Sequence, residues 1–403
     1  MFKSIFKRQI IPITLSLACG IGFMMYTKKS NAHAHTGHNQ YVNYKTPVEN
    51  EVPNKPVACQ GSCIKLSLLL DTSSSMNGLI EQAKSQLWRI TKELSATERN
   101  GEDIGLQIAL YEYGNDRLDK SKGFIKQLCP LTTDIDLVSE KLFSLTTNGG
   151  SEHCGQVIKK SLDQLDWGDD KGELKLIYIA GNETFEQGPI NYKKACESAK
   201  DDGIIVNTIF CGDYKTGINM KWKAGAHVTG GEYMNIDHNR QTVYYDAPQD
   251  DRLDVLNEEL NKTYMSYNGA GAAKIQSMIA NDSNAESYSK ANKSDRIAFK
   301  SSKMYKNSEW DLLDAYEEKE EKVFDEIKEL PSELKGKSKA EMKKILEEKK
   351  AKRAQIKEEI GKLSKERDAY IVKQRKKDNN DFSLDENILK SVKKQAASKG
   401  YSF

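Results

Sequence analysis

The sequence between residues 64 and 267 alternates short apolar runs, rich in β-branched residues, with longer amphipathic segments. Residues 64–70 are almost continuously apolar, as is typical of a parallel strand covered on both faces, whereas residues 78–94 carry apolar side chains at helical spacing. Further strands are predicted at residues 104–113, 124–128, 174–180, 204–210 and 232–236, and further helices at residues 134–145, 156–165, 192–200 and 252–267. This alternation predicts an α/β fold, with a doubly wound, mostly parallel sheet that carries helices on both faces.

The composition changes after about residue 269, where strand signals disappear and Lys and Glu dominate. Residues 269–307 begin with a loose stretch rich in Ala, Asn and Ser, and we interpret them as a linker with a short helix. Residues 308–403 are predicted to be α-helical and partly coiled-coil, with a helical hairpin followed by a terminal helix. The capping signals of these three helices lie at Ser308 and Pro331, at Ser338, and at Ser383 and Gly400.

The charges of the helical region favour a spacer or a docking surface. Lys349 and Arg353 occupy positions on the expected seam, where buried charges destabilise a coiled coil unless they are paired. Lys and Glu interleave rather than segregate, which is typical of solvated helices. The whole chain has 61 basic and 59 acidic residues and a formal net charge of +2, so no global field favours nucleic acid as a partner.

The N-terminal residues indicate export. Lys3, Lys7 and Arg8 precede an apolar run at residues 10–25, and small-residue cleavage sites follow before residue 35. Residues 1–34 are therefore interpreted as a signal peptide, with an uncleaved membrane anchor as the alternative and a lipoprotein at Cys19 as a third. Each interpretation places the body outside the cytoplasm, in the periplasm or at the cell envelope, and only a retained N-terminal segment would bind a membrane.

The number of cysteines also indicates export to an oxidising compartment, in agreement with the N-terminal residues. Six remain after the export segment, and an even number in an exported chain indicates disulfides, although six cysteines allow 15 pairings. Residues 35–62 are expected to form a polar linker, at the end of which Cys59 and Cys63 could close a small loop. The other candidates, which could instead be buried small hydrophobic residues, are Cys129, Cys154, Cys196 and Cys211.

Oxygen-bearing side chains follow the first predicted strand at alternating positions. Asp71, Ser73 and Ser75 come directly after the apolar run, at the carboxyl end of a central parallel strand, where such sheets bind ligands. One carboxylate and two hydroxyls suit Mg²⁺ or Mn²⁺, which retain several waters and can accept a further oxygen from another molecule. The pattern therefore predicts a site for a hard divalent cation.

Three stretches of the chain resemble the von Willebrand factor type A family. They are LLLDTSSSM around Asp71, TTNGGSEHCG around Ser151 and AGAHVTGGEYMNI around Gly230, and the resemblance covers residues 64–267. It implies a type A-like domain at residues 63–268 in which Asp71, Ser73 and Ser75 hold the ion of a MIDAS-type site. It also implies adhesion or complex assembly rather than catalysis.

Two loops depart from the family pattern. The second loop usually supplies a Thr after paired glycines, and this chain has Ser151 with Glu152 beside it. The third loop usually supplies an Asp after the fourth strand, where this chain offers Asn182 or Glu183. A carboxamide contributes less charge than a carboxylate, so the ion is expected to be held more weakly unless Glu152 or Glu183 joins the site.

The sequence thus predicts an exported protein-binding module. In it, a divalent ion held by the three loops engages a protein partner, whose acidic residue completes the metal sphere. A hydrolase is not expected, because Ser73 and Ser75 lie outside any G-x-S-x-G nucleophile elbow. The alternative is a metal-free, type A-like scaffold whose C-terminal helices mediate the interaction.

Overall fold

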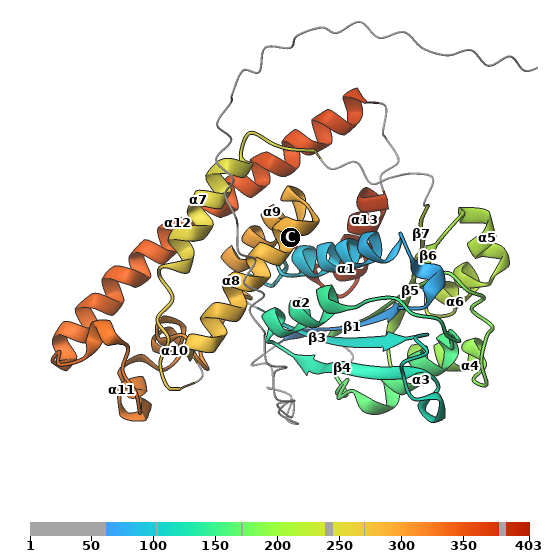
Figure 1. Ribbon diagram of the computed structural model, residues 1–403, viewed down its shortest axis with the longest axis horizontal. Coiled ribbons are helices and arrows are strands. Elements are labelled where there is room, and N and C mark those ends of the chain that lie inside the picture. Colours follow the sequence, from blue (N-terminus) through green and yellow to red (C-terminus); the bar gives the residue numbers. More distant parts are fainter. Residues whose placement is uncertain (1–61, 102–103, 171, 238–244, 270, 379–383) are drawn as a thin grey trace, which may run out of the picture. The chain divides into compact units, whose positions relative to one another are not determined.

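A computed structural model describes residues 62–403 except 102–103, 171, 238–244, 270 and 379–383 (Figure 1). The predicted export segment, Cys59 and the Ser383 cap lie outside the described residues. No helix in the described part of the chain is long and apolar enough to cross a membrane.

The described residues contain a six-stranded sheet with the order β4-β3-β1-β5-β6-β7. Strands β1, β3, β5, β6 and β7 pair in parallel, and β4 pairs with β3 in antiparallel orientation at one edge. The predicted fold class is confirmed, since every predicted strand is present. The strands are β1 Cys63–Asp71, β3 Gly105–Tyr113, β4 Ile125–Thr132, β5 Leu174–Gly181, β6 Ile205–Cys211 and β7 Tyr233–Ile236.

Helices cover both faces of this sheet. Successive residues of β1 point to opposite faces, so Leu68 and Leu70 share one core with the helices α1, α2 and α7, whereas Leu69 belongs to a second core with α3, α4 and α6. The short helices α5 and α6 were not predicted. The bounds are α1 Ile80–Leu94, α2 Ile135–Ser144, α3 Cys154–Gln164, α4 Tyr192–Asp201, α5 Tyr214–Asn219, α6 Trp222–Val228 and α7 Asp250–Asn261, with 3-10 turns at Ser74–Met76 and Lys120–Lys122.

The prediction of a linker with a short helix at residues 269–307 leaves out most of the helical structure there. These residues form two helices, α8 Gly271–Tyr288 and α9 Lys290–Ser301, which pack on α2 and α1 respectively. Phe299 of α9 is fully buried, and its ring centroid lies 5.7 Å from that of Trp88 on α1. The helices therefore extend the first core of the sheet domain. Their apolar residues are few and separated by Asn, Ser and Ala, which is why the composition resembles that of a linker.

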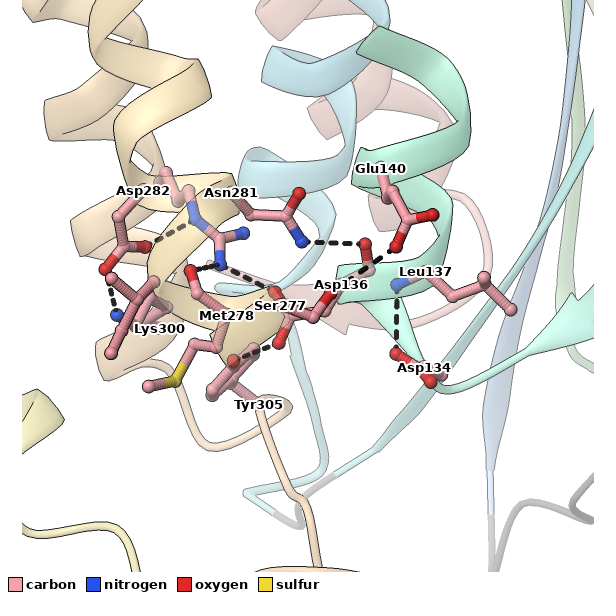
Figure 2. Close-up of polar contacts among 12 residues, drawn as sticks. Asp134, Asp136, Leu137, Glu140, Ser277, Met278, Asn281, Asp282, Lys300 and Tyr305 are labelled. Atoms are coloured by element: carbon pink, nitrogen blue, oxygen red, sulfur yellow. Dashed lines mark hydrogen bonds and ion pairs between the residues drawn. The ribbon is translucent and has the colours of Figure 1, made fainter. Parts of the chain in front are cut away.

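A buried ion network joins α8 and α9 to α2 (Figure 2). Arg296 of α9 lies 2.6 Å from both Asp136 of α2 and Asp282 of α8, and Lys300 lies 2.7 Å from Asp282. The hydroxyl of Tyr305 donates a hydrogen bond to Asp136. Because Arg296 and Lys300 are buried, each needs these carboxylates to compensate for the loss of water.

The C-terminal region is helical, as predicted, but the first arm of the expected hairpin differs from the prediction. That arm begins at the cap Asp311 rather than Ser308, and it is interrupted at Glu320, whose φ of +50° is incompatible with a continuous helix. The capping box at Ser338 is confirmed, and α12 extends from it for 39 residues. The elements are α10 Leu312–Lys319, α11 Val323–Glu326, α12 Lys339–Lys377 and α13 Leu384–Ala397, with 3-10 turns at Glu320–Lys322 and Ser332–Leu334.

Pairing explains how charged side chains occupy the seam of α12. Arg353 is buried, and its Nη1 lies 2.5 Å from Asp311 Oδ2 and 2.8 Å from Asp314 Oδ1. Lys349 lies 2.9 Å from Glu333. The long helix α12 packs on α7, α9 and α10, as Figure 1 shows for α7. The helical region is thus attached to the sheet domain.

The end of the chain also returns to the sheet domain. Helix α13 packs on α1 and β7. Beyond it, β8 (Tyr401–Ser402) pairs in antiparallel orientation with β2 (Glu98–Arg99), a two-stranded sheet that the sequence did not predict.

Four of the disulfide candidates are unpaired. Cys129, Cys154, Cys196 and Cys211 are free and buried, and burial raises the pKa of each thiol. They pack as small hydrophobic residues, which is the alternative that the sequence left open. The pairing of Cys63 with Cys59 stays a prediction, because Cys59 lies outside the described residues.

Candidate metal centre

At the end of β1, Asp71 is buried and bonded to the loop that carries Ser73 and Ser75. Asp71 is fully buried, and its Oδ1 accepts a hydrogen bond of 2.8 Å from the backbone N–H of Ser73. The backbone N–H of Thr72 donates to the carbonyl of Tyr113 at 2.9 Å, which continues the pairing of β1 with β3 into the loop. A 3-10 turn follows at Ser74–Met76, and it leaves Ser75 exposed.

Hydroxyl groups connect the first loop to the third. Ser73 Oγ and Ser75 Oγ are 2.8 Å apart, and Ser75 Oγ donates to Asn182 Oδ1 at 2.9 Å. Asn182 follows β5, which neighbours β1 in the sheet. The predicted meeting of these loops at the carboxyl edge of the sheet is therefore present in the structure.

The second loop reaches the same place through its backbone and through Glu152. The N–H of Asn148 donates to the carbonyl of Thr72 at 2.9 Å. A methyl group built on Gly114 would lie 2.7 Å from Asp71 Oδ1 and 3.0 Å from Glu152 Cγ, so both acidic side chains border the same point. Glu152 is buried and Ser151 is half-buried. Glu152 is thus the residue of this loop that the contacts bring next to Asp71.

Asn115 joins the first and second loops to the end of β3, and the sequence analysis missed it. Its Nδ2 lies 3.1 Å from Glu112 Oε1, 3.2 Å from the carbonyl of Thr146 and 3.3 Å from Thr72 Oγ1. It lies two residues after the end of β3, so its position after a buried strand was the available signal. Asn115 positions the loops rather than facing the space beside Asp71.

Burial dominates the electrostatics of the site. It raises the pKa of Asp71 to about 8, against the lowering effect of the hydrogen bonds from Ser73, and the charge of Glu152 adds to the increase. Burial also raises the pKa of Glu152, to which the charge of Glu183 contributes in the same direction. Two neighbouring carboxyl groups are therefore hard to ionise unless a cation lies between them.

The donor set fits a hard cation. Asp71 Oδ2 is buried and has no hydrogen-bond partner among the described residues. Such an atom is costly unless a proton or a cation satisfies it. No group of three or more His, Cys, Asp and Glu side chains that could hold a metal is present in the described ranges. The set here is instead mixed, with carboxylate, hydroxyl and carboxamide oxygens, which suits Mg²⁺ or Mn²⁺.

The two serine hydroxyls form hydrogen bonds within the site. Both hydroxyls hydrogen-bond to each other or to Asn182, and neither has a histidine partner among the described residues. The histidine of the second loop is His153, and its Nδ1 lies 3.1 Å from Gln156 Oε1.

No family model matches this sequence. No curated protein matches it either. Among solved structures, the chain is similar to BatB from Bacteroides thetaiotaomicron, with 17% identity over 43% of this chain and 90% of that one and a TM-score of 0.33. It is also similar to an aerotolerance-related membrane protein from Bacteroides fragilis, with 17% identity over 43% of this chain and 92% of that one and a TM-score of 0.31. A third is proximal thread matrix protein 1 from the mussel byssus, solved with a zinc-occupied MIDAS motif, with 13% identity over 45% and 44% of the two chains and a TM-score of 0.33.

Proposed function

We propose that this chain is an exported protein-binding module that acts through a divalent cation, Mg²⁺ or Mn²⁺, at the edge of its type A-like sheet. Asp71, Ser73 and Ser75 would hold the ion. Ser151, Glu152, Asn182 and Glu183 are the further candidates. The partner is a protein that offers an acidic side chain to the ion, and the helices after residue 268 add a second surface for docking.

The observation that carries the proposal is the unsatisfied oxygen of Asp71. A buried carboxyl with one free oxygen, next to two serine hydroxyls and a second buried carboxyl, has no structural use in a packed core. A bound cation would compensate both acidic groups and would supply an open coordination position. This chain's residues would set the position of the ion, and the bound carboxylate of a partner would complete its sphere.

The proposal predicts direct binding of the metal. Titration of the full chain with Mn²⁺ should show one site by calorimetry, and the same titration of Asp71→Asn should show a loss of at least about tenfold in affinity, because one charged ligand is removed. Asp163→Asn is the matched control, since it removes an exposed carboxylate on α3 and should leave binding unchanged.

The outcomes separate the two candidate functions. Equal Mn²⁺ affinity in the wild type and Asp71→Asn would overturn the metal site. A wild type that binds neither Mn²⁺ nor Mg²⁺ at millimolar concentration would favour the metal-free scaffold. In that case, a protein partner bound to the full chain should stay bound when a chelator is added, because the scaffold uses no metal.

A further inference from the structure

A cavity of about 730 Å³ lies between the sheet domain and the C-terminal helices, away from the loops that carry Asp71. Its walls come from α1, α9, α12 and α13, together with Tyr245 and the terminal Phe403. The volume falls within the range of small-molecule sites in proteins, about 300 to 1,000 Å³. Nothing in the proposed protein-binding function uses it.

One face of the second half of α12 borders the cavity. The residues of this face recur every three or four positions, as on one side of a helix, and they are Lys357, Gly361, Ser364, Asp368, Ile371 and Arg375. Gly361 is the middle of the face, and a methyl group built on it would meet no atom within 4 Å. A glycine within a long helix costs about 1 kcal/mol relative to alanine. Here it leaves the centre of the wall open.

The charge of the wall is predominantly positive. Eight of the lining residues are Lys or Arg, and four are Asp or Glu. All four acidic side chains already pair with lysines of the same wall: Glu93 with Lys393, Glu98 with Lys303, and Asp295 and Asp368 with Lys92. Lys357 and Lys365 make no ion pair among the described residues. Arg367 pairs with Asp250 outside the wall at 2.6 Å, so Lys357 and Lys365 are the cations that we assign to a ligand.

Two buried hydroxyl groups of the wall are unsatisfied hydrogen-bonding groups within the described residues. Ser364 Oγ on α12 and Ser302 Oγ after α9 are buried and form no hydrogen bond within the described part of the chain. Ser364 is 8% exposed as a residue. Buried hydroxyls are normally satisfied, so an acceptor group inside the cavity would remove a cost that the free protein bears.

The wall also has an apolar part. Ile104, Met304, Leu389 and Phe403 come from four separate parts of the chain and all line the cavity. We propose that this cavity binds an anionic amphipathic small molecule, whose apolar body lies against these side chains and whose carboxylate or phosphate lies near Lys357 and Ser364. The site is independent of the proposed metal centre.

The test compares three probes that share one apolar chain. Decanoate, decyl phosphate and uncharged decanol are titrated into the full chain and followed by calorimetry. At least one of the two anions should bind at least about tenfold more tightly than decanol, because a hydrogen-bonded charge strengthens binding by that amount. A preference between the two anions identifies carboxylate or phosphate as the natural head group.

Substitutions locate the probe. Gly361→Phe should fill the cavity and weaken binding of the anion about tenfold or more, whereas Gly361→Ala, the matched control, should leave it nearly unchanged. Lys357→Met keeps a long apolar stem and should weaken the anion but not decanol, which keeps the test decisive if Gly361→Phe does not fold. Absence of binding of all three probes, equal affinity for decanol and the anions, or unchanged anion binding in both Gly361→Phe and Lys357→Met would overturn the proposal.

Discussion

Ser75 donates its hydroxyl hydrogen to Asn182 Oδ1 at 2.9 Å, although the two residues are 107 positions apart in the sequence. The contact joins the loop after β1 to the loop after β5 at the carboxyl edge of the sheet. It also places a neutral carboxamide beside the hydroxyl of Ser75. The strength of the proposed metal site should therefore depend on the charge at position 182.

Asn182→Asp should raise the affinity of the full chain for Mn²⁺ and Mg²⁺ by about tenfold. The substitution keeps the shape of the side chain and adds one negative charge beside Ser75, and the affinity of oxygen sites rises with the number of charged ligands. Isothermal titration of the two proteins under identical salt conditions measures the change.

Asn284→Asp is the comparison for this prediction, since it adds the same negative charge at an exposed position of α8, outside the loops of the site. It should bind the ion within a factor of about three of the wild type. An Asn182→Asp protein that binds no more tightly than the wild type would show that position 182 does not contact the ion.

Gly114→Ala should weaken metal binding and lower the free energy of unfolding by about 1 to 3 kcal/mol. The glycine has a φ of +77°, and an added methyl group would lie 2.7 Å from Asp71 Oδ1 and 3.0 Å from Glu152 Cγ. Gly101→Ala separates the two effects, because Gly101 has a φ of +75° but no atom within 4 Å of an added methyl group. Denaturant unfolding should show a cost in both variants, and Mn²⁺ titration a loss in Gly114→Ala alone.

The strands and helices of the sheet domain were predicted well, because each is encoded by the pattern of apolar residues within its own segment. The apolar run of β1 and the helical spacing of α1 follow from contacts that each segment makes by itself with a core. The prediction of a linker with a short helix at residues 269–307 was incomplete because the two helices there are stabilised by few apolar side chains and by buried ions. The partners of those ions, such as Asp136 for Arg296, lie 160 residues away along the chain.

The candidate site was predicted in part for the same reason. Asp71, Ser73 and Ser75 belong to one short motif, and Asn182 and Glu183 were candidates through the resemblance to the von Willebrand factor type A family. Gly114 and Asn115 were missed, because their importance comes from the backbone and side-chain atoms of other loops. The placement of Glu152 next to Asp71, ahead of Ser151, also depends on how the second loop turns at Gly150, which has a φ of +152°.

Arg296→Met should destabilise the protein by about 3 to 5 kcal/mol, because it leaves two buried carboxylates without their shared cation. Asp136 and Asp282 each lie 2.6 Å from the guanidinium, and all three side chains are buried (Figure 2). Chemical denaturation at pH 7 measures the loss.

The control for this substitution is Lys303→Met, which breaks an exposed pair with Glu98 at 3.4 Å. Surface pairs contribute little, so the midpoint of unfolding should barely move. Similar losses in the two variants would contradict the claim that the buried network attaches α8 and α9 to the sheet domain.

The same network should make stability depend on acid pH. Burial alone would raise the pKa of Asp282, but the charges of Lys300 and Arg296 outweigh it and hold the pKa below the ordinary value of 3.8. Between the two values the unfolded chain binds more protons than the folded one, so the contribution of Asp282 is present above pH about 4 and is lost as the pH falls further. Unfolding midpoints measured from pH 6 to pH 3 should show the wild type more stable than Asp282→Asn, with an advantage that shrinks below pH about 4. A constant difference across this range would mean that the Asp282 carboxylate is not stabilised by its two cationic neighbours.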